Sequence, residues 1–520
     1  MLKDRASGEI RTEEFTMSYL PCFSAETWTL LLTFLCLFIA YGYWPFGLFR
    51  KLGISGPKPL PFFGTIFIYG KGFAQADIEC FRKYGRIWGI YDGRLSSVCT
   101  VETGIIRTVL VKGFYPYFTN RRDFRFSGPL NDSLNNARDE SWRRIRTSLS
   151  PSFSSGRLKE MFKRMKQQAD KLVRCLQKNT NSEAVDIKQF FSAYAVDVLA
   201  STTISLDTDS FNNPSDPVVM RVKKIDFNFN NPCFLLSVVF PFLDPLLEKA
   251  NLCIFPLAEV RFLCNFLNKV ILDREKNVHV KQVDFLQQMI DSQLAETKVG
   301  TNESKKGMTR REILSQAVMS WIGGRDIISK SLAFLSHNLA TNPDAMKKLQ
   351  DEIDQVFPNK APVTYAELMQ MGYLDMVLNE SLRRYPIALR IERLCSETIV
   401  IGGVTIPKGT LVQIPVYALH HDPDLWPEPE CFRPERFGKE NKHSLDPYAF
   451  LPFGAGPRNC IAMRFVTVLM KLAVVQVLQN FSFAVCEETE IPLQLDNSPL
   501  LGTKNPIKLK VVPRFPVMEE

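Results

Sequence analysis

The chain has 520 residues, 45% of them hydrophobic and 39 of them phenylalanine, so it can bury a large core and is neither disordered nor fibrous. Its 64 Lys and Arg exceed its 55 Asp and Glu, and the resulting charge of +9 has no long basic run, which disfavours nucleic acid and suits an acidic partner or a membrane. Twelve cysteines without a C-x-x-C pair do not form a disulfide scaffold, and they indicate a reducing compartment.

An uncharged apolar run from Thr27 to Phe49 predicts a membrane anchor. Its 23 residues are enough, because a bilayer needs roughly 20. A buried core helix and a cleaved signal peptide are the alternatives, although the chain shows neither a basic start nor a clear small-residue cleavage site. Residues 1–26 carry a net charge of −2, whereas Arg50 and Lys51 follow the run, so the positive-inside rule predicts a luminal N-terminus and a cytosolic remainder.

The chain is predicted to have four parts. A luminal segment, 1–26, and the anchor, 27–49, are followed by a linker and one large domain. Residues 50–64 contain three prolines, which predict a stiff, non-helical linker. Residues 65–520 show mainly helical periodicity, with a strand-like stretch from Glu397 to Val416 that glycines and a proline interrupt. The predicted fold is therefore mainly α with small β sheets.

A long helix is predicted after the polar stretch 295–307, which we expect to be a mobile loop. The helix begins at Thr309, because Thr309 and Glu312 have the spacing of a capping box, and it ends near Asn342. Adjacent glycines at 323 and 324 lie in its middle. Each costs about 1 kcal/mol relative to alanine, so either they serve a function or they are a tolerated surface pair.

Two further motifs follow. Glu380 and Arg383 share one face of a helix that Pro386 ends, but an isolated E-x-x-R pair is weak evidence. The stronger signal is F-x-x-G-x-R-x-C at residues 453–460, a glycine-rich loop directly before a long apolar helix. Cys460 would meet the positive end of that helix, which favours a thiolate, and the alternative is a buried structural cysteine.

These motifs, in this order, resemble the haem-thiolate monooxygenases, the cytochromes P-450, from the anchor to the C-terminal strands. The resemblance is closest to vertebrate family three, the microsomal drug- and steroid-oxidising enzymes. The segments that carry it are FTNRRDF, SWRRIRTSLSPSFSSGRLKEMF, FPFLDPLLEKANLCIFP, VDFLQQMIDSQ and LPFGAGPRNCIAMRF. It implies the cytochrome P-450 fold, with a single large haem domain on an N-terminal transmembrane helix. Ala462 stands where the family usually has glycine.

The resemblance implies haem b with Cys460 as the axial thiolate and metal ligand, a bond that favours O–O cleavage. It implies that Phe453 packs near the sulfur and that Gly456 permits close approach of the backbone. The residues implied to hold the haem propionates are Arg121, Trp142, Arg146, Arg393 and Arg458. The implied buried charge network, which would position the cysteine loop, is Glu380, Arg383 and Arg436. Arg143 and Arg144 are expected on a solvated helix face.

The middle of the long helix departs from the family pattern of small residue, glycine, any residue, acid and threonine. Asp326 supplies the acid, but Ile327 replaces the threonine, whose hydroxyl ordinarily helps to deliver protons. Proton delivery must then use Asp326, the substrate or ordered water. The predicted catalytic residues are Gly323, Gly324, Asp326 and Ile327. Arg325 and Lys330 are unusual here, and Arg325 is expected to pair near Asp326 or to reach solvent.

The implied activity is insertion of one oxygen atom from O2 into lipophilic substrates such as steroids, fatty acids and xenobiotics. Electrons would come from NADPH through an NADPH-cytochrome reductase, with cytochrome b5 as a further partner. The implied location is the endoplasmic reticulum membrane, with the catalytic domain in the cytosol. Substrate would contact Ile387, Ala388 and Leu389, and the apolar segment 240–257 is either an entry route from the membrane or a core helix.

The sequence leaves three other functions as alternatives. Ile327 and Ile328 favour a peroxide or endoperoxide isomerase that resembles thromboxane synthase and needs no reductase. A haem-binding protein with low turnover is the second, and the complete substrate-side architecture argues against it. A hydrolase based on His420, His421 and Asp422 is the third, and no nucleophile elbow accompanies these residues.

Overall fold

The computed structural model describes residues 24–123, 127–180, 182–225, 232–250, 252–277, 279, 282–293, 307–441 and 444–515. The chain divides into two compact units, residues 1–44 and 45–520. The predicted mobile loop 295–307 lies outside the described residues except for its last residue, Gly307, and most of the predicted luminal segment also lies outside them.

The first unit contains helix α1, Ala25–Tyr43, which begins where the Ser24 hydroxyl accepts a hydrogen bond from the amide of Thr27. Its large apolar side chains face outward, with Leu30, Phe34 and Leu37 between 66% and 71% exposed. In the part of the chain that the structure describes, the one helical run long and apolar enough to cross a membrane is Ala25–Lys51. The outward-facing side chains exclude the buried core helix, one of the two alternatives to an anchor.

The second unit contains three small sheets. The four-stranded sheet has the order β1-β2-β7-β4, and only its β2–β7 pair is parallel. Glycines 402 and 403 form the turn of a separate β5–β6 hairpin, so the predicted strand-like stretch 397–416 is confirmed as β5, β6 and β7. The strands are β1 Ile87–Asp92, β2 Leu95–Thr100, β3 Val185–Asp186, β4 Arg390–Leu394, β5 Ile399–Ile401, β6 Val404–Ile406, β7 Leu411–Pro415, β8 Phe481–Ala484 and β9 Lys508–Pro513.

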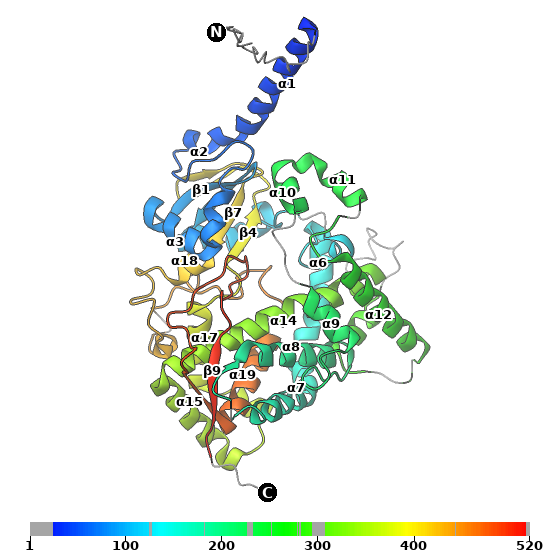
Figure 1. Cartoon of the computed structure of the whole chain (residues 1–520), viewed down its shortest axis with the longest axis vertical. Coiled ribbons are helices and arrows are strands. Elements are labelled where there is room, and N and C mark those ends of the chain that lie inside the picture. The colour runs from blue at the N-terminus through cyan, green and yellow to red at the C-terminus, as the bar shows by residue number, and fades with distance from the viewer. Residues whose placement is uncertain are drawn as a thin grey trace, which may run out of the picture. The chain divides into compact units, whose positions relative to one another are not determined.

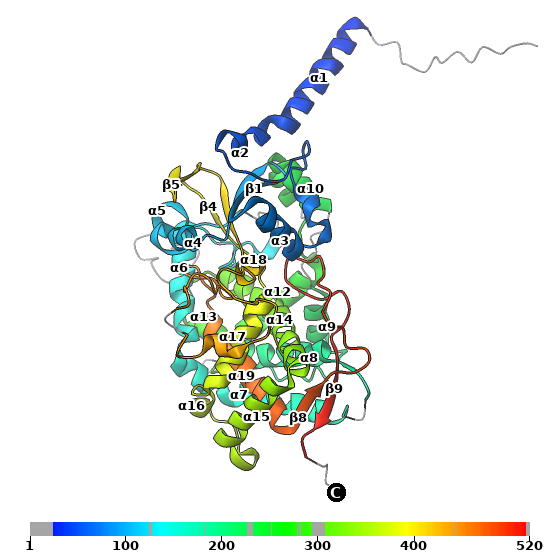
Figure 2. The same ribbon diagram turned by 90° about the vertical axis from the view of Figure 1, so that its left-hand side faces the viewer.

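Helices make up most of this unit, which confirms the predicted mainly α class. The longer ones are α3 Phe73–Tyr84, α6 Asp139–Leu149, α7 Ser155–Gln177, α8 Ile187–Ile204, α12 Leu257–Lys276, α14 Arg310–Thr341, α15 Pro343–Val356, α17 Gly372–Arg384 and α19 Met463–Asn480. The shorter α helices are α2 Leu48–Lys51, α4 Thr103–Arg107, α5 Phe114–Tyr117, α9 Pro217–Lys224, α10 Pro232–Val239, α11 Asp244–Lys249, α13 Phe285–Asp291, α16 Tyr365–Leu368 and α18 Val416–His420. Figures 1 and 2 show the four-stranded sheet toward one end of this unit and the β8–β9 pair toward the other.

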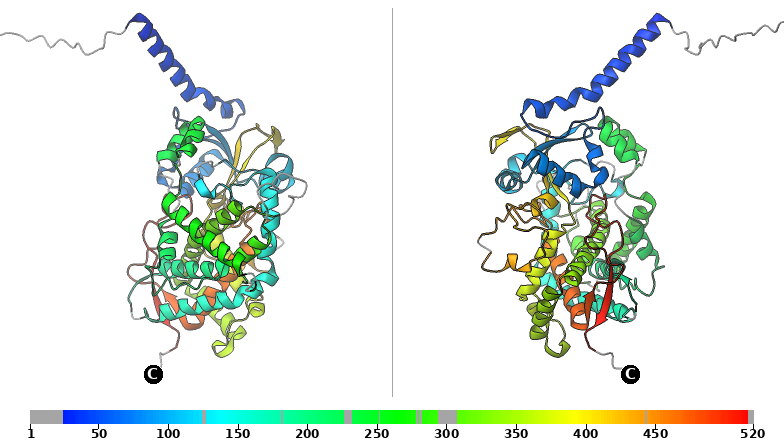
Figure 3. Two further views of the ribbon diagram at one scale, coloured as in Figure 1. Left: turned by 90° about the vertical axis from the view of Figure 1, so that its right-hand side faces the viewer. Right: turned by 60° about the vertical axis from the view of Figure 1, so that its left-hand side comes forward.

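The core lies where α8, α14 and α19 run among the other helices, and parts of orange α19 are visible between them in both views of Figure 3. Both α8 and α19 are buried along most of their length, because their sequences are apolar on all sides. Tyr194 of α8 donates a hydrogen bond to the carbonyl of Leu469 in α19 at 3.1 Å. Helix α14 has the predicted start, since Thr309 and Glu312 form a capping box in which each side chain bonds the other's backbone amide.

The proline-rich segment 50–64 is non-helical from Leu52 to Thr65, as expected, but it packs onto the second unit as part of it. Ser55 accepts a hydrogen bond from the amide of Gly89 in β1, and Gly64 pairs with Asp92 at the end of the same strand. Phe49, assigned to the anchor from the sequence, is 5% exposed and packs against Tyr91 and Gly89. The last five residues of the predicted anchor therefore belong to the second unit.

Candidate functional site

One large cavity, of about 1350 Å³, lies between α14, strand β4 and the loop before α19. It exceeds the roughly 300–1,000 Å³ of an ordinary ligand pocket, so it has room for a cofactor together with a substrate. The predicted site residues in its wall are Arg121, Trp142, Arg146, Gly323, Gly324, Ile327, Ile387, Ala388, Leu389, Arg393, Phe453, Arg458 and Cys460. Those that do not line it are Asp326, Gly456, Glu380, Arg383 and Arg436.

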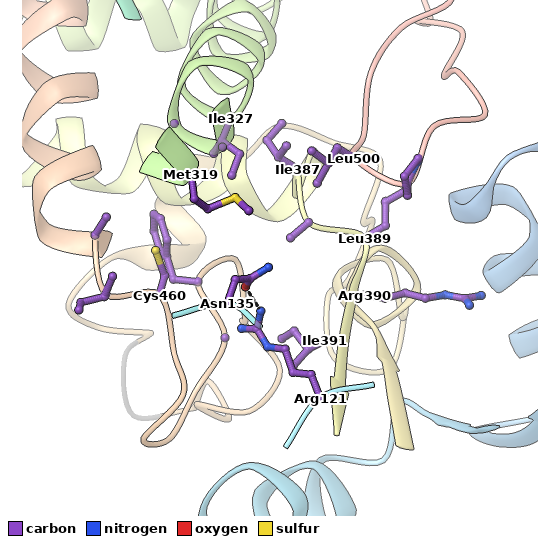
Figure 4. A pocket seen from close by; sticks show the side chains of 18 of the residues that line it. Arg121, Asn135, Met319, Ile327, Ile387, Leu389, Arg390, Ile391, Cys460 and Leu500 are labelled. Atoms are coloured by element: carbon purple, nitrogen blue, oxygen red, sulfur yellow. Dashed lines mark hydrogen bonds between the residues drawn. The ribbon is translucent and has the colours of Figure 1, made fainter. Parts of the chain in front are cut away.

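Cys460 opens into this cavity from the loop before α19, on the side opposite the apolar side chains of α14 and β4 (Figure 4). The Cys460 amide donates to the carbonyl of Phe453 at 2.9 Å and closes the loop. Arg146 of α6 holds the next residue, Asn459, through its backbone and side-chain oxygens, both at 2.8 Å. Burial raises the pKa of the Cys460 thiol, while the Ala462 amide and the cations of Arg146 and Arg121 act in the opposite direction. Burial therefore opposes the thiolate that a helix end favours.

Glycine 456 serves the loop itself and does not face the cavity. Its φ is +74°, and a side-chain carbon there would lie 1.9 Å from the carbonyl oxygen of Leu110. The close backbone approach that Gly456 permits is thus made to the carbonyl of Leu110. Gly454, which sequence reasoning passed over, has φ +71° and does line the cavity.

Four arginines converge on the cavity: Arg121, Arg146, Arg393 and Arg458. Within the described residues none of them forms an ion pair with a carboxylate; they donate to Asn135, Asn459 and backbone carbonyls instead. Burial and mutual repulsion lower the pKa of Arg393 and lower that of Arg458 to about 9. Buried cations without counterions are costly, and the Nε–H groups of Arg393 and Arg458 are buried without a hydrogen-bond acceptor. The cavity therefore suits a ligand that brings negative charge.

The predicted charge network is present, with Glu380 and Arg383 fully buried and Arg436 partly buried. Arg383 binds both carboxylate oxygens of Glu380 at 2.8 and 2.9 Å, and Arg436 reaches the same carboxylate at 3.2 Å. Arg383 also donates to the carbonyl of His420 at 2.8 Å, and the His420 ring accepts from the amide of Leu451 at 2.9 Å. Burial lowers the pKa of His420 well below its ordinary value, so its ring is neutral. These contacts connect α17 to the start of the cysteine loop.

His420 links the charge network to the cysteine loop, a role that the sequence did not indicate, since there it belongs only to the disfavoured hydrolase hypothesis. In the structure Asp422 binds Arg86 at 2.7 Å, and the His420 ring bonds only backbone groups among the described residues. A histidine between two backbone groups has no distinctive spacing in a sequence.

The two glycines of α14 have different surroundings. A side-chain carbon at Gly323 would meet nothing within 4 Å, whereas one at Gly324 would lie 2.9 Å from the side chain of Leu199 on α8. Gly323 therefore widens the cavity, and Gly324 allows α8 to approach α14. Both line the cavity, which excludes a surface glycine pair, and the helix is continuous across them.

The charged residues of α14 differ from expectation. Arg325 is buried and donates to the carbonyl of Val222 at 2.8 Å, so it does not extend into solvent. The carboxylate of Asp326 lies 2.9 Å from the ammonium group of Lys330, one turn along the helix. Ile327 carries the apolar side chain that faces the cavity (Figure 4). A carboxylate held in an ion pair outside the cavity wall is poorly placed to supply protons there.

The position of Arg144 also differs from the prediction of a solvated helix face. Its neighbour Arg143 is exposed, as expected, but Arg144 is 6% exposed and binds Glu312 of the α14 capping box through two hydrogen bonds. Its charge pattern resembled that of a solvated helix face, because Arg143 and Arg144 are adjacent in sequence. Their side chains project from α6 about 100° apart, so only one of them faces solvent.

The cavity wall also contains residues that the sequence did not indicate. They include Asn135, Met319, Arg390, Leu500 and the C-terminal stretch Asp496–Pro499. Arg390 is an ion-pair partner of the buried Asp77. The C-terminal stretch carries no motif and is more than a hundred residues from β4, so no local pattern could assign it to the site.

The family model described as cytochrome P450 matches residues 54–511 of the chain. Among curated relatives, cytochrome P450 3A27 of Oncorhynchus mykiss is 54% identical over 501 residues, which cover 96% of each chain. Cytochrome P450 3A30 of Fundulus heteroclitus is 54% identical over 493 residues, covering 94% of this chain and 99% of the relative. Cytochrome P450 3A13 of Mus musculus is 49% identical over 500 residues, covering 96% and 99%.

Proposed function

We infer the reaction from the premise that this chain belongs to the cytochrome P450 family. The protein is accordingly a haem monooxygenase with a cysteine thiolate ligand, and it takes electrons that originate in NADPH from a redox partner. Its substrates are lipophilic molecules, into which it inserts one oxygen atom. It has an N-terminal apolar helix that suits a microsomal membrane protein.

Cys460 is proposed as the thiolate, because it is the cysteine in the wall of the cavity and no other described cysteine lines it. When bound, haem supplies the activation of dioxygen and the transfer of one oxygen atom. Coordination to a metal deprotonates a thiol outright, which overcomes the rise that burial imposes on the pKa of Cys460.

The four convergent arginines and Trp142 are proposed to hold the haem propionates. Two carboxylates would supply the counterions that Arg393 and Arg458 lack among the described residues, and would accept from their unpartnered Nε–H groups. Phe453, also in the cavity wall, is proposed to pack near the sulfur. Glu380, Arg383 and Arg436 are proposed as structural residues that act on the cysteine loop through His420.

Steroids, fatty acids and xenobiotics are the substrate classes we propose. The apolar wall formed by Ile327, Ile387, Leu389 and Leu500 supports this proposal, because it offers dispersion contacts and few polar groups. The segment 240–257 is not one continuous core helix: it contains short helices in which Phe242 and Leu246 are exposed, while Leu247 and Phe255 are buried. We propose that these side chains contact the membrane and give access to lipophilic substrates.

An NADPH-cytochrome reductase, with cytochrome b5 as a second partner, is proposed as the source of electrons. The endoplasmic reticulum is proposed as the location, with residues after Arg50 in the cytosol, on the basis of the charges that flank the apolar run. We propose the parts 1–26, 27–49, 50–64 and 65–520 for the luminal segment, anchor, linker and catalytic domain. The boundary of the anchor is adjusted, because residues from Pro45 onward belong to the second compact unit.

Peroxide isomerisation is a second candidate. Ile327 has no proton to give, and Asp326 is paired with Lys330, an arrangement that suits a reaction without external electrons. Gly323, Gly324, Asp326 and Ile327 remain the proposed catalytic positions of the distal helix, with Gly323 providing space.

The test is reconstitution of the full chain with reductase in vesicles. NADPH use and loss of substrate are followed over a panel of steroids, fatty acids and drug-like lipophiles, with an organic peroxide tested in parallel. Oxygenated product that depends on reductase supports the monooxygenase. Rearranged peroxide product in the absence of reductase, with no oxygenation in its presence, would replace it with the isomerase.

A further inference from the structure

Lys330 is a lysine on α14 whose side chain is buried in the core of the second unit. Its side chain is 9% exposed, and its ammonium group has two partners: the carboxylate of Asp326 at 2.9 Å and the carbonyl oxygen of Leu500 at 3.1 Å. The first partner lies on the same helix, one turn earlier. The second lies 170 residues away in the chain, within the C-terminal loop.

The C-terminal loop is a hairpin-like segment whose tip enters the cavity wall. Its base is closed by pairing of Leu495 with Thr503 and by the hydrogen bond from the Asp496 amide to the Gly502 carbonyl at 2.9 Å. Residues 496–500, at the tip, all line the cavity. Movement of this tip would therefore change the space available to a substrate.

Leu500 is held on two sides. Its backbone pairs with Ala388, and the amide of Leu501 donates to the carbonyl of Ile387 at 2.8 Å. Lys330 binds the Leu500 carbonyl from α14. Three wall segments, which carry Ile327, Ile387 and Leu500, are therefore joined at one point, and Figure 4 shows these three side chains grouped beside α14.

We propose that Lys330 is a specificity-determining positioning residue that fastens residues 496–502 to α14 and so holds Leu500 over the cavity. This role rests on the proposed monooxygenase site, whose substrate space it limits. With the cation in place, the carbonyl of Leu500 has a charged donor in a site with little water, and that hydrogen bond is strong. Without the cation, the Asp326 carboxylate loses this partner and the Leu500 carbonyl keeps the Ser498 hydroxyl as its donor among the described residues. The tip then loses its connection to α14 and opens more often, although its backbone still pairs with residues 387 and 388.

The effect of losing Lys330 on ligand affinity is expected to depend on the size of the ligand. A bulky ligand needs an open loop, and its apparent affinity in the wild type is reduced by the small fraction of molecules in which the loop is open. Loss of Lys330 raises that fraction and so favours bulky ligands. A ligand smaller than the existing cavity gains nothing, because it fits with the loop closed.

The experiment compares Lys330→Met with Lys330→Arg, which keeps a cation, and with Lys347→Met. Lys347 is the matched control, because it forms an ion pair with Asp351 at 2.7 Å across one helical turn, in the reverse order along the chain and on an exposed face. The dissociation constants of imidazole and of the triphenyl azole clotrimazole are measured from the Soret shift of the haem-loaded protein. Hydrogen exchange is followed in peptides that cover residues 494–503.

Lys330→Met should bind clotrimazole about fivefold or more tightly than the wild type, with imidazole unchanged within about twofold and with faster exchange in 494–503. Lys330→Arg should restore the wild-type values, and Lys347→Met should not differ from the wild type. Equal changes for both azoles, or unchanged exchange in 494–503, would overturn the proposal.

Leu500→Ala covers the case in which Lys330→Met fails to fold, because it shortens the held side chain and leaves the ion pair in place. A selective gain for clotrimazole in Leu500→Ala supports the role of the loop tip, and no gain overturns it. A wild-type protein that does not take up haem would contradict the proposed function instead, and the exchange of 494–503 in the haem-free variants would then decide the role of Lys330.

Discussion

Arg144 on α6 binds the carboxylate of Glu312 on α14 through two hydrogen bonds, of 2.9 and 2.5 Å between nitrogen and oxygen. The same carboxylate accepts the amide of Thr309 at 2.8 Å, so one group both caps α14 and joins it to α6. Arg144 also donates to the carbonyl of Gly307. The position of the distal helix over the cavity thus depends on a side chain outside the cavity wall.

Substitution Arg144→Ala should lower the free energy of unfolding by about 3–5 kcal/mol, because it leaves a buried carboxylate without its cation. Arg143→Ala is the control, since Arg143 is exposed and its pair with Glu140 is worth at most about 1 kcal/mol. Denaturation by urea, followed by circular dichroism, measures both. Similar losses in the two variants would contradict the bridging role of Arg144.

The boundary of the anchor gives a second prediction. Deletion of residues 1–44 should leave a folded protein that takes up haem, because the second compact unit begins at Pro45. Deletion of residues 1–49 should be less stable by about 1.5–3 kcal/mol, because it removes the buried ring of Phe49 from its site on Tyr91 and Gly89.

Phe49→Ala in the protein lacking residues 1–44 is the matched control, and it should reproduce most of the difference. Thermal unfolding and haem content are measured for all three proteins. Equal melting temperatures for the two deletions would mean that Phe49 adds nothing to the second unit.

Sequence reasoning succeeded where a function requires particular residues at short spacing. The E-x-x-R pair, the cysteine loop and the capping box are local motifs, and each has the expected geometry. It failed where burial decides. Arg144 and Arg325 have sequence surroundings like those of solvated residues, yet each is buried against a segment far along the chain. Lys330, for which the sequence indicates no partner, is buried in the same way.

The reason is physical. A cation reaches a buried position when a carboxylate or carbonyl from another element is present to receive it. In this chain the receiving groups on other elements lie 103 to 170 residues from the cation, whereas Asp326, the second partner of Lys330, is local. Periodicity reports which face of a helix is apolar, but it carries no information about such distant partners.

A third prediction concerns acid. Burial and the nearby Arg383 lower the pKa of His421 to about 3, from an ordinary value of about 6.5. The unfolded chain therefore binds a proton in the interval between these values that the folded chain does not. The stabilisation is complete above pH 6.5 and is lost progressively as the pH falls toward 3.

The free energy of unfolding should fall by about 2 kcal/mol between pH 7 and pH 5 because of this one group. His421→Asn, which retains a donor for the Tyr417 carbonyl, should show a correspondingly flatter dependence. Urea unfolding at both pH values for both proteins provides the measurement. Identical slopes would show that His421 does not control the response.

The fourth prediction concerns the axial ligand. Cys460→Ala should abolish the red-shifted carbon monoxide absorption of the reduced protein, because that spectrum requires a thiolate opposite the ligand. Cys395→Ala and Cys486→Ala should retain it, since both sulfurs are hydrogen-bonded outside the cavity wall. Haem content is measured alongside, so that loss of the band can be separated from loss of haem. A persistent band in Cys460→Ala would overturn the assignment of the ligand.

The last prediction concerns the supply of protons beside α14. Ile327 offers no donor to the cavity, and Asp326 is held by Lys330. Without a positioned donor, O–O cleavage is slow, and two-electron-reduced dioxygen is released and takes two protons from bulk water to become hydrogen peroxide. NADPH is then consumed in excess of product. Ile327→Thr should then raise the ratio of product to NADPH, because a positioned proton donor is worth about 10²–10⁴ in rate.

Ile327→Val is the matched control, because valine has the shape of threonine without the hydroxyl. If the ratio of product to NADPH rises in Ile327→Thr but not in Ile327→Val, the hydroxyl donor is responsible. An equal rise in both variants reflects only the space created beside Gly323. High coupling in the wild type that Ile327→Thr fails to improve would mean that substrate or ordered water already supplies the proton. It would reject the impaired relay and leave the monooxygenase in place. Turnover of peroxide without reductase, unaffected by either substitution, would instead favour the isomerase, since that reaction transfers no external electrons and needs no proton at this position.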